Sequence, residues 1–386
     1  MHQEPSGVWI MAYTTIDDPS AHFQTALWSG DDATTQDITN DGNSDLQPDL
    51  VWVKCRNTNG NGFGPTVWDT SRGVSNSVNT SLTSSENDSE GLGGVMTTTA
   101  QLGGVSAMLS DGFTVREGSI DDDSRYVNEN TRTYVGWQWK ANGGSRTTFA
   151  EDGNNPAGGY QANTTAGISV VDYTGTGAVG TMAHGLGAVP DCIIIKNRDE
   201  HDNWAVYHSA NTSAPETDYL VFNLASATTD DATYWNDTAP TSSVFTVATD
   251  HKVNADGEKY IAYCFRSVQG YSKFGVYTGN GDDDGAFIYT GFKPAWVMTK
   301  QNGGNNYWHI HDNKRNPFNP VGKELKANES FAEADPAGGE NNRDFLSNGF
   351  KFRDYDHNNH AYTYIYMAFA EQPFVTSGGV PCTGGG

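Results

Sequence analysis

The sequence predicts an all-β protein of three tandem, related β-sandwich units of jelly-roll type, with little helix. The first observation behind this prediction is an internal repeat, because one order of strand and turn signals occurs three times in 386 residues and such repeats are typical of duplicated modules. The second is composition. The chain has 44 glycines and 12% aromatic residues, arranged as short Val-, Ile-, Tyr- and Trp-rich runs between Asn, Asp, Gly and Ser, as in strands joined by turns.

Five landmarks define the repeat. Each unit opens on an aromatic residue before a polar-glycine turn, at 28–30, 173–175 and 277–279. A proline then starts an apolar run that ends in lysine, at 48–54, 190–196 and 294–300, where proline is tolerated because the first strand residue need not donate a hydrogen bond. We expect a tryptophan strand next, at Trp68, Trp204 and Trp308. An alternating strand follows at 110–116, 243–247 and 347–353, and an aromatic strand closes each unit at 133–139, 259–265 and 363–369.

These landmarks divide the chain into segments. We expect a leader or attachment segment at 1–22, unit one at 23–141 with a long loop insertion at 73–104, a linker at 142–165, unit two at 166–269, unit three at 270–376 and a flexible tail at 377–386. The insertion and the linker have few large apolar residues to offset the entropy of ordering them, so both are interpreted as irregular surface segments. Units two and three should therefore pack tightly, with unit one set apart.

Charge and targeting signals exclude several partners. With 47 acidic against 23 basic residues the net charge is −24, so nucleic acid should be repelled. The first residues do not have the pattern of a signal peptide, and no apolar run is long enough to predict a membrane span. The four cysteines, Cys55, Cys192, Cys264 and Cys382, are too far apart for a disulfide framework, which favours synthesis in a reducing cytoplasm.

Catalytic signals are weak. No pair of acids lies in an apolar setting as a glycosidase would need, and Glu340 and Glu371 are interpreted as solvated surface acids. No serine lies in a strand-to-helix nucleophile elbow. The sequence therefore predicts a protein that is not an enzyme, with a polysaccharide-active hydrolase as the least favoured alternative.

No cofactor is predicted, and metal sites are kept as alternatives to ordinary turns and internal hydrogen bonds. His309 and His311 lie on one face of a strand, with His357 and His360 later in the same unit. The acidic turns 41–45, 121–123 and 282–285 offer oxygen ligands for structural calcium without the spacing of an EF-hand. The weak metal candidates are Asp282, Asp283, Asp284, His309 and His311.

Aromatic residues in polar segments are the candidates for ligand binding. Tyr234 and Trp235 lie in a polar stretch, and Tyr307 follows a Gly- and Asn-rich turn. Exposed aromatic side chains often mark binding sites. Trp235 has no counterpart in the other units, so it is the preferred candidate for an exposed sugar-stacking contact.

Three runs of sequence, 11–20, 270–281 and 364–375, resemble a β-rich, poorly characterised family of virion structural proteins of tailed phages, many of them marine. The resemblance extends over residues 11–381, while the insertion in unit one and the residues before Met11 depart from it. It implies a fibre-like or lectin-like structural protein of the virion, made in the host cytoplasm, with other virion proteins as partners. It carries over no catalytic residues.

Two functions follow as expectations. The first is a tail fibre or spike that adheres to the host by non-catalytic binding of a surface glycan, as a homo-oligomer that we expect to be a trimer. The second is a capsid decoration protein or head fibre attached to the coat lattice. The absence of coiled-coil, collagen-like or β-helix repeats in the sequence brings the second close to the first.

Overall fold

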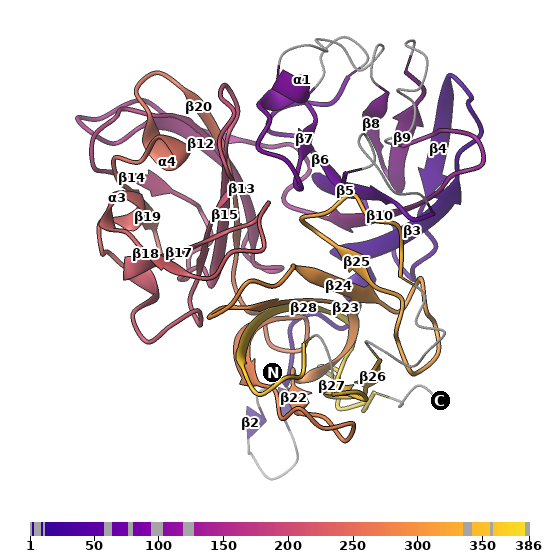
Figure 1. The fold of residues 1–386 in the computed structure, drawn as a ribbon. Coiled ribbons are helices and arrows are strands. Elements are labelled where there is room, and N and C mark those ends of the chain that lie inside the picture. The colour runs from indigo at the N-terminus through magenta and orange to yellow at the C-terminus, as the bar shows by residue number, and fades with distance from the viewer. Residues whose placement is uncertain are drawn as a thin grey trace.

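The computed structural model describes residues 2–3, 9–10, 12–57, 64–75, 80–93, 103–118, 127–334, 342–355 and 358–382. It confirms the all-β class with three sandwich units, which lie around a common centre (Figure 1). Strands β1 (His2–Gln3) and β2 (Trp9–Ile10) pair with each other ahead of unit one. The described helices are single turns: η1 (Pro19–Ala21), α1 (Glu90–Gly93), η3 (Pro215–Thr217), α3 (Ala232–Trp235) and α4 (His251–Asn254). None of them has the length and apolar character needed to cross a membrane.

Each unit combines a large sheet with a small one. In unit one the large sheet has the order β3 (Phe23–Ser29), β10 (Thr133–Trp139), β5 (Leu50–Cys55), β6 (Thr66–Asp69), β7 (Leu82–Thr83), and the small sheet β4 (Thr35–Thr39), β9 (Gly112–Arg116), β8 (Gly104–Leu109). In unit three the orders are β21 (Ser272–Thr278), β28 (Thr363–Pro373), β23 (Phe292–Gln301), β24 (His309–Asp312), β25 (Leu325–Lys326) and β22 (Phe287–Tyr289), β27 (Gly349–Phe352), β26 (Arg343–Leu346).

Unit two has the same plan with extra strands at both edges. Its large sheet has the order β11 (Thr147–Phe149), β12 (Ala157–Asn163), β13 (Ile168–Thr174), β20 (Lys259–Phe265), β15 (Cys192–Asn197), β16 (Ala205–His208), β17 (Asp218–Val221), β18 (Thr229–Asp230), and its small sheet pairs β14 (Gly180–Ala183) with β19 (Val244–Val247). In all three units the closing aromatic strand lies between the first and second strands of the repeat. The three repeats of the sequence therefore fold with the same strand order.

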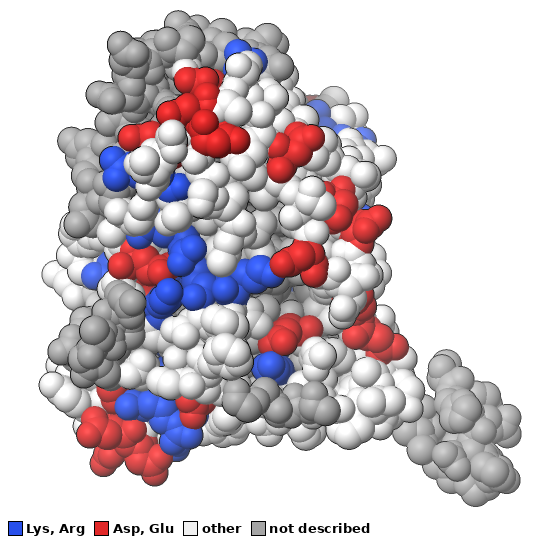
Figure 2. Space-filling model, turned by 90° about the vertical axis from the view of Figure 1, so that its right-hand side faces the viewer, with Lys and Arg blue, Asp and Glu red and all other residues white. Residues whose placement is uncertain are grey.

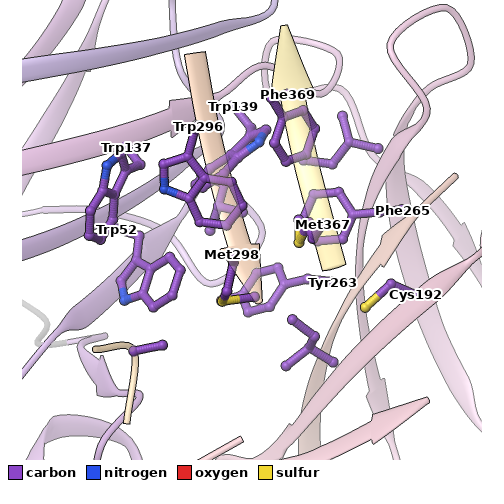
Figure 3. Close-up of a cluster of buried hydrophobic side chains, with 14 of the residues drawn as sticks. Trp52, Trp137, Trp139, Cys192, Tyr263, Phe265, Trp296, Met298, Met367 and Phe369 are labelled. Carbon is purple, nitrogen blue, oxygen red and sulfur yellow. The ribbon is translucent and has the colours of Figure 1, made fainter. Parts of the chain in front are cut away.

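The closing strands are apolar on both faces because both faces are buried. In β10, Trp137 and Trp139 point to the centre of the molecule, whereas Tyr134 packs between the two sheets of unit one. β20 and β28 repeat this alternation, which follows from the two-residue period of a strand. The shared central core is shown in Figure 3, where the labelled side chains from the three units are Trp52, Trp137, Trp139, Cys192, Tyr263, Phe265, Trp296, Met298, Met367 and Phe369. An apolar cavity of about 40 Å³ remains among them.

Unit one is therefore not set apart, and two of the expected irregular segments contain strands in their described parts. Residues 142–165 are not a plain linker, because they form β11 and β12 and extend the sheet of unit two. Within the insertion 73–104, β7 pairs with β6 and buries Leu82 in the central core. Backbone pairing orders these strands, and it does not require a long run of apolar side chains.

The ends of the body also pack more closely than expected. In the segment 12–22, Tyr13 Oη donates to Gly291 O of unit three at 2.7 Å and Thr14 Oγ1 donates to Gln269 O at the end of unit two at 2.9 Å, so these residues lie against the body rather than standing free as a leader. In the expected tail, Cys382 N donates to Phe374 O at 2.8 Å. Residues 383–386 lie outside the described part.

Strand register corrects the expected equivalence of three tryptophans. Asp69, His208 and Asp312 occupy the same place at the ends of β6, β16 and β24, since they pair with Leu50, Cys192 and Trp296 respectively. Trp68 is therefore equivalent to Tyr207 and His311. Trp204 and Trp308 are equivalent to Pro65. Each of the two indoles donates a hydrogen bond to a backbone carbonyl of the preceding unit.

Two of the three unit boundaries carry the same buried ion pair. Tyr263 Oη of unit two donates to Asp69 Oδ2 of unit one at 2.8 Å, and Asp69 pairs with Arg72. In the equivalent place Trp137 Nε1 of unit one donates to Asp312 Oδ2 of unit three at 3.1 Å, and Arg315 Nε lies 2.6 Å from the same oxygen. Each aspartate is thus balanced by an arginine and joined to the next unit.

The boundary between units two and three uses a neutral pair instead. Met367 replaces the donor, and His208 replaces the aspartate. His208 Nε2 lies 3.2 Å from Tyr366 O, and its Nδ1 accepts a hydrogen bond from Ala210 N at 3.2 Å. These two contacts assign the proton to Nε2. Burial lowers the pKa of His208 to about 4.

Replacing Tyr263 by Phe should lower the free energy of unfolding by about 2 kcal/mol, because the change removes a hydrogen bond to a buried carboxylate. Chemical denaturation measures this loss. The matched control is Tyr362→Phe at a side chain that is 55% exposed, where we expect a change within about 0.5 kcal/mol. Equal effects at the two positions would contradict a stabilising role for the boundary hydroxyl.

Acidification should destabilise the protein through His208. The unfolded imidazole binds a proton below about pH 6.5, whereas the buried one does so only near pH 4, so stability is present above pH 6.5 and falls by about 3 kcal/mol on the way down to pH 4. His208→Gln should remove this part of the pH dependence. Unfolding curves of both proteins between pH 4 and 8 test it, and parallel pH profiles would disprove the assignment.

Candidate functional site

The preferred sequence candidate, Trp235, is not exposed. Its side chain is 2% exposed, and Nε1 donates to Asp218 O at 3.0 Å. Tyr234 is 1% exposed and stacks on Tyr219 with 3.7 Å between ring centroids. The expectation of a sugar-stacking indole here is wrong, because the single turn of α3 folds both rings into the core of unit two.

Tyr307 is partly exposed and lies in unit three, away from Tyr234 and Trp235. Its ring lies 4.3 Å from Lys326 Nζ and packs edge-on against Phe331. The structure therefore does not bring the three predicted aromatic residues together. Lys326 already covers one face of the Tyr307 ring.

The two strand histidines belong to an internal polar cluster. His309 and His311 are fully buried, and His309 Nδ1 lies 2.8 Å from Glu324 Oε2. Burial raises the pKa of Glu324, but His309, Lys326 and Arg343 outweigh it and lower the pKa to about 2. The cluster is closed to solvent, since the side chains of His309 and His311 are fully buried and that of Glu324 is 3% exposed.

The acidic turns have ordinary partners where they are described. Asp284 pairs with Lys351 at 2.8 Å, and Asp282 Oδ1 accepts from Asp284 N at 2.9 Å, as in an Asx turn. Within the described ranges no three His, Cys, Asp or Glu side chains are grouped so as to hold a metal ion. Asp121, Asp122, Asp123 and His357 lie outside those ranges.

A polar groove between units one and three is the candidate functional site. It consists of a hollow of about 340 Å³ that adjoins a second one of about 250 Å³, the size range of small-ligand sites. Both hollows are lined by Asp18, Asn43, Glu371 and Gln372. The larger one also reaches Phe23, Gln24, Asp41 and Lys314, and the smaller one Asp17, Pro373 and Val380.

Unit one and the segment before it form the first wall by a network of short hydrogen bonds. Asp18 caps η1: its Oδ1 accepts from Ser20 N at 3.0 Å, and its Oδ2 accepts from Ser44 Oγ at 2.6 Å. Burial raises the pKa of Asp18, but the hydrogen bonds from Ser20 and Ser44 outweigh this and lower it. Asp18 therefore stays ionised at neutral pH.

Gln24 fixes the turn at 41–44 against η1. Its Nε2 donates to Ser20 O at 3.0 Å and to Ser44 O at 2.7 Å, and its Oε1 accepts from Gly42 N at 2.9 Å. A Cβ atom at residue 42 would lie 2.5 Å from Gln24 Oε1. The close approach of turn and amide thus depends on glycine.

Unit three forms the second wall. Asn313 Nδ2 donates to Glu371 Oε2 at 2.8 Å, and Lys293 Nζ lies 2.9 Å from the same oxygen. Lys314 Nζ reaches across to Asp41 Oδ1 of unit one at 2.6 Å. The carboxylates of the groove are thereby oriented by neighbours from both units. Figure 2 shows that the side of the molecule carrying these units mixes basic and acidic side chains despite the net charge.

The groove is open because unit one carries no extra strand outside β3 in the described part of the chain. At the equivalent boundary of units one and two, β12 lies outside β13 and brings Gln161 into the space. Gln161 Oε1 accepts from Thr70 Oγ1 at 3.0 Å, and its Nε2 donates to Ser71 Oγ at 2.8 Å. Thr70 and Ser71 correspond to Asn313 and Lys314. The space next to the first strand of a unit is thus filled by Gln161 at the boundary of units one and two and is open at the boundary of units one and three.

The sequence indicates parts of this site without joining them. It offers the turn 41–45 as a possible calcium site and predicts Glu371 to be a solvated acid, whereas both line one groove. No local signal connects residues as far apart as Asp41 and Lys314, which are separated by 273 positions. The repeat gives one signal for the site, because the equivalence of β6 and β24 places residues 313–314 at a unit boundary.

Comparison with protein families gives one match. Residues 18–373 match a family whose description is a domain of unknown function (DUF7483). No curated protein and no solved structure matches the chain. The match covers the three units and most of the groove.

Gln24→Ala should loosen the groove wall, because it removes three hydrogen bonds to backbone groups that are partly buried. We expect a loss of about 1–3 kcal/mol in unfolding free energy and faster hydrogen exchange at Gly42. The control is Gln36→Ala, whose amide makes one long bond of 3.3 Å to Ser29 O. Unchanged exchange at Gly42 would contradict the bracing role of Gln24.

Proposed function

The chain belongs to the family of the domain of unknown function DUF7483. From the resemblance of its sequence to phage structural proteins, and from the groove between units one and three, we propose that it is a virion surface protein that binds a host-surface glycan without catalysis. The glycan lies in the groove between units one and three. This role extends the resemblance of the sequence to phage structural proteins.

The groove supports recognition because its chemistry suits hydroxyl-rich ligands. Amide side chains of Asn43 and Gln372 and the carboxylates of Asp18 and Glu371 supply donors and acceptors, while Phe23 and Pro373 supply apolar surface. Sites of this kind have a few positioned polar groups on a mostly rigid scaffold. The single observation that carries the proposal is this hollow, which two units build at one boundary.

Binding is favoured over turnover by how the acids are held. Both oxygens of Asp18 accept hydrogen bonds, and Glu371 is paired with Lys293. A general acid needs a raised pKa in an apolar setting, whereas the pKa of Asp18 is lowered. These carboxylates suit the role of fixed hydrogen-bond acceptors.

A capsid decoration protein is the second candidate, and the surface of unit three favours it. Phe287 and Tyr289 project from the same side of β22 and are 46% and 48% exposed. Two neighbouring exposed aromatic side chains fit contact with another protein. In this alternative unit three rests on the coat lattice.

Labelling of the chain on intact particles, combined with binding of the purified chain to host cells, tests the proposal. We expect label on the tail and cell binding that Asn43→Trp abolishes, because a large side chain at this exposed position obstructs the place where the two hollows meet. The matched control is Asn130→Trp, at an exposed asparagine outside the groove. Label on the head without cell binding would reject adhesion in favour of decoration.

A further inference from the structure

We infer that the groove takes a saccharide of at least two linked residues, neutral or amino-bearing, and rejects acidic sugars. This inference rests on the proposed function and assigns its ligand class. Three properties of the groove lead to it: its length, its charge and the supply of hydrogen-bonding groups.

The length follows from the two adjoining hollows. Asp18, Asn43, Glu371 and Gln372 line both, so the hollows meet at a shared waist. The larger lies toward Lys314 and Asp41, and the smaller toward Pro373, Val380 and Cys382. Two hollows in series match two successive rings of one chain, with the waist at the linkage. A single compact ring would leave one of them to water.

The charge of the lining excludes acidic sugars. Four carboxylates line the groove, those of Asp17, Asp18, Asp41 and Glu371, and the lining includes one ammonium, that of Lys314, which is paired with Asp41. The ammonium of Lys293 pairs with Glu371 from outside the lining, so the acids still exceed the bases by two. A uronate or sialate carboxylate placed here would meet fixed like charges, and such juxtaposition opposes binding strongly in a partly desolvated site. An amino sugar would be attracted by the same groups.

The waist supplies the hydrogen bonds. Asn43 is exposed, and its side chain makes no hydrogen bond to the described part of the chain. Gln372 is exposed as well, with its Oε1 3.3 Å from Cys382 Sγ. These two amides present donors and acceptors to ring hydroxyls, while Asp18 and Glu371 are fixed by their own partners. The acceptors are therefore in place before a ligand arrives, which lowers the entropy cost of binding.

Calorimetric titration of the full chain with three disaccharides tests the inference. The probes are a disaccharide of N-acetylglucosamine, the same disaccharide of glucosamine, and a disaccharide that contains glucuronate. We expect the first two to bind, with the glucosamine form tighter, and the glucuronate form to bind at least about tenfold more weakly. The double variant D41N/E371Q should reduce this discrimination, because it removes two of the four negative charges.

The matched control carries the same charge change outside the groove, at the exposed acids Glu151 and Asp230. Discrimination that falls equally in E151Q/D230N would show an effect of net charge alone and would overturn the inference. Equal binding of all three disaccharides, or binding of none, would overturn it too. If host-cell binding is then still abolished by Asn43→Trp, the groove remains the adhesion site and only the saccharide class is wrong. If Asn43→Trp leaves cell binding unchanged, both the saccharide class and the proposed function of the groove are rejected.

Discussion

The shared aromatic core is the constraint on which the rest of the structure depends. Each large sheet has one face against its own small sheet and the other against the centre, so every closing strand must be apolar on both faces. Burial of this kind stabilises a protein roughly in proportion to the apolar area removed from water. It also has a cost, since the indole nitrogens of Trp52, Trp139 and Trp296 have no hydrogen-bond partner among the described residues. Large rings are used here for volume and shape rather than for polar contacts.

Polar groups at the rim of this core set how the units are oriented around it. A buried aspartate is costly unless it is paired and hydrogen-bonded, and Asp69 and Asp312 meet both conditions through an arginine of their own unit and a donor of the next. Where Met367 offers no donor, a neutral histidine replaces the charge. The three lysines at the ends of β5, β15 and β23 follow the same logic. Lys54, Lys196 and Lys300 are fully buried, and the ammonium groups of Lys196 and Lys300 donate to loop carbonyls.

The repeat, the all-β fold class and the strand positions were predictable because they depend on local features of the sequence. These features are apolar patterns with a period of two residues and the turn residues between them. The closing strands and the proline-to-lysine strands lie where the sequence predicts them. Packing between units was not predictable, since Gly- and Ala-rich segments such as 157–163 are ordered by backbone pairing that leaves little trace in side-chain type. The prediction that Trp235 is exposed was wrong for a related reason. Its polar neighbours indicated a loop on the surface, but the turn they form directs the ring inward. The groove joins residues from opposite ends of the chain, and no local pattern encodes it.

Covalent fusion of the three units into one polypeptide has a consequence for how recognition evolves. In an assembly of three identical subunits every junction has the same sequence. A substitution that opens a hollow at one junction therefore opens it at all three, and it weakens the contact at all three. Here each junction mutates independently. The boundary of units one and two is held by the Asp69–Arg72 ion pair and by the hydrogen bonds of Gln161, and that of units two and three by a neutral imidazole. The boundary of units one and three keeps the Asp312–Arg315 ion pair in the interior, so the residues that line its groove can vary without loosening the body.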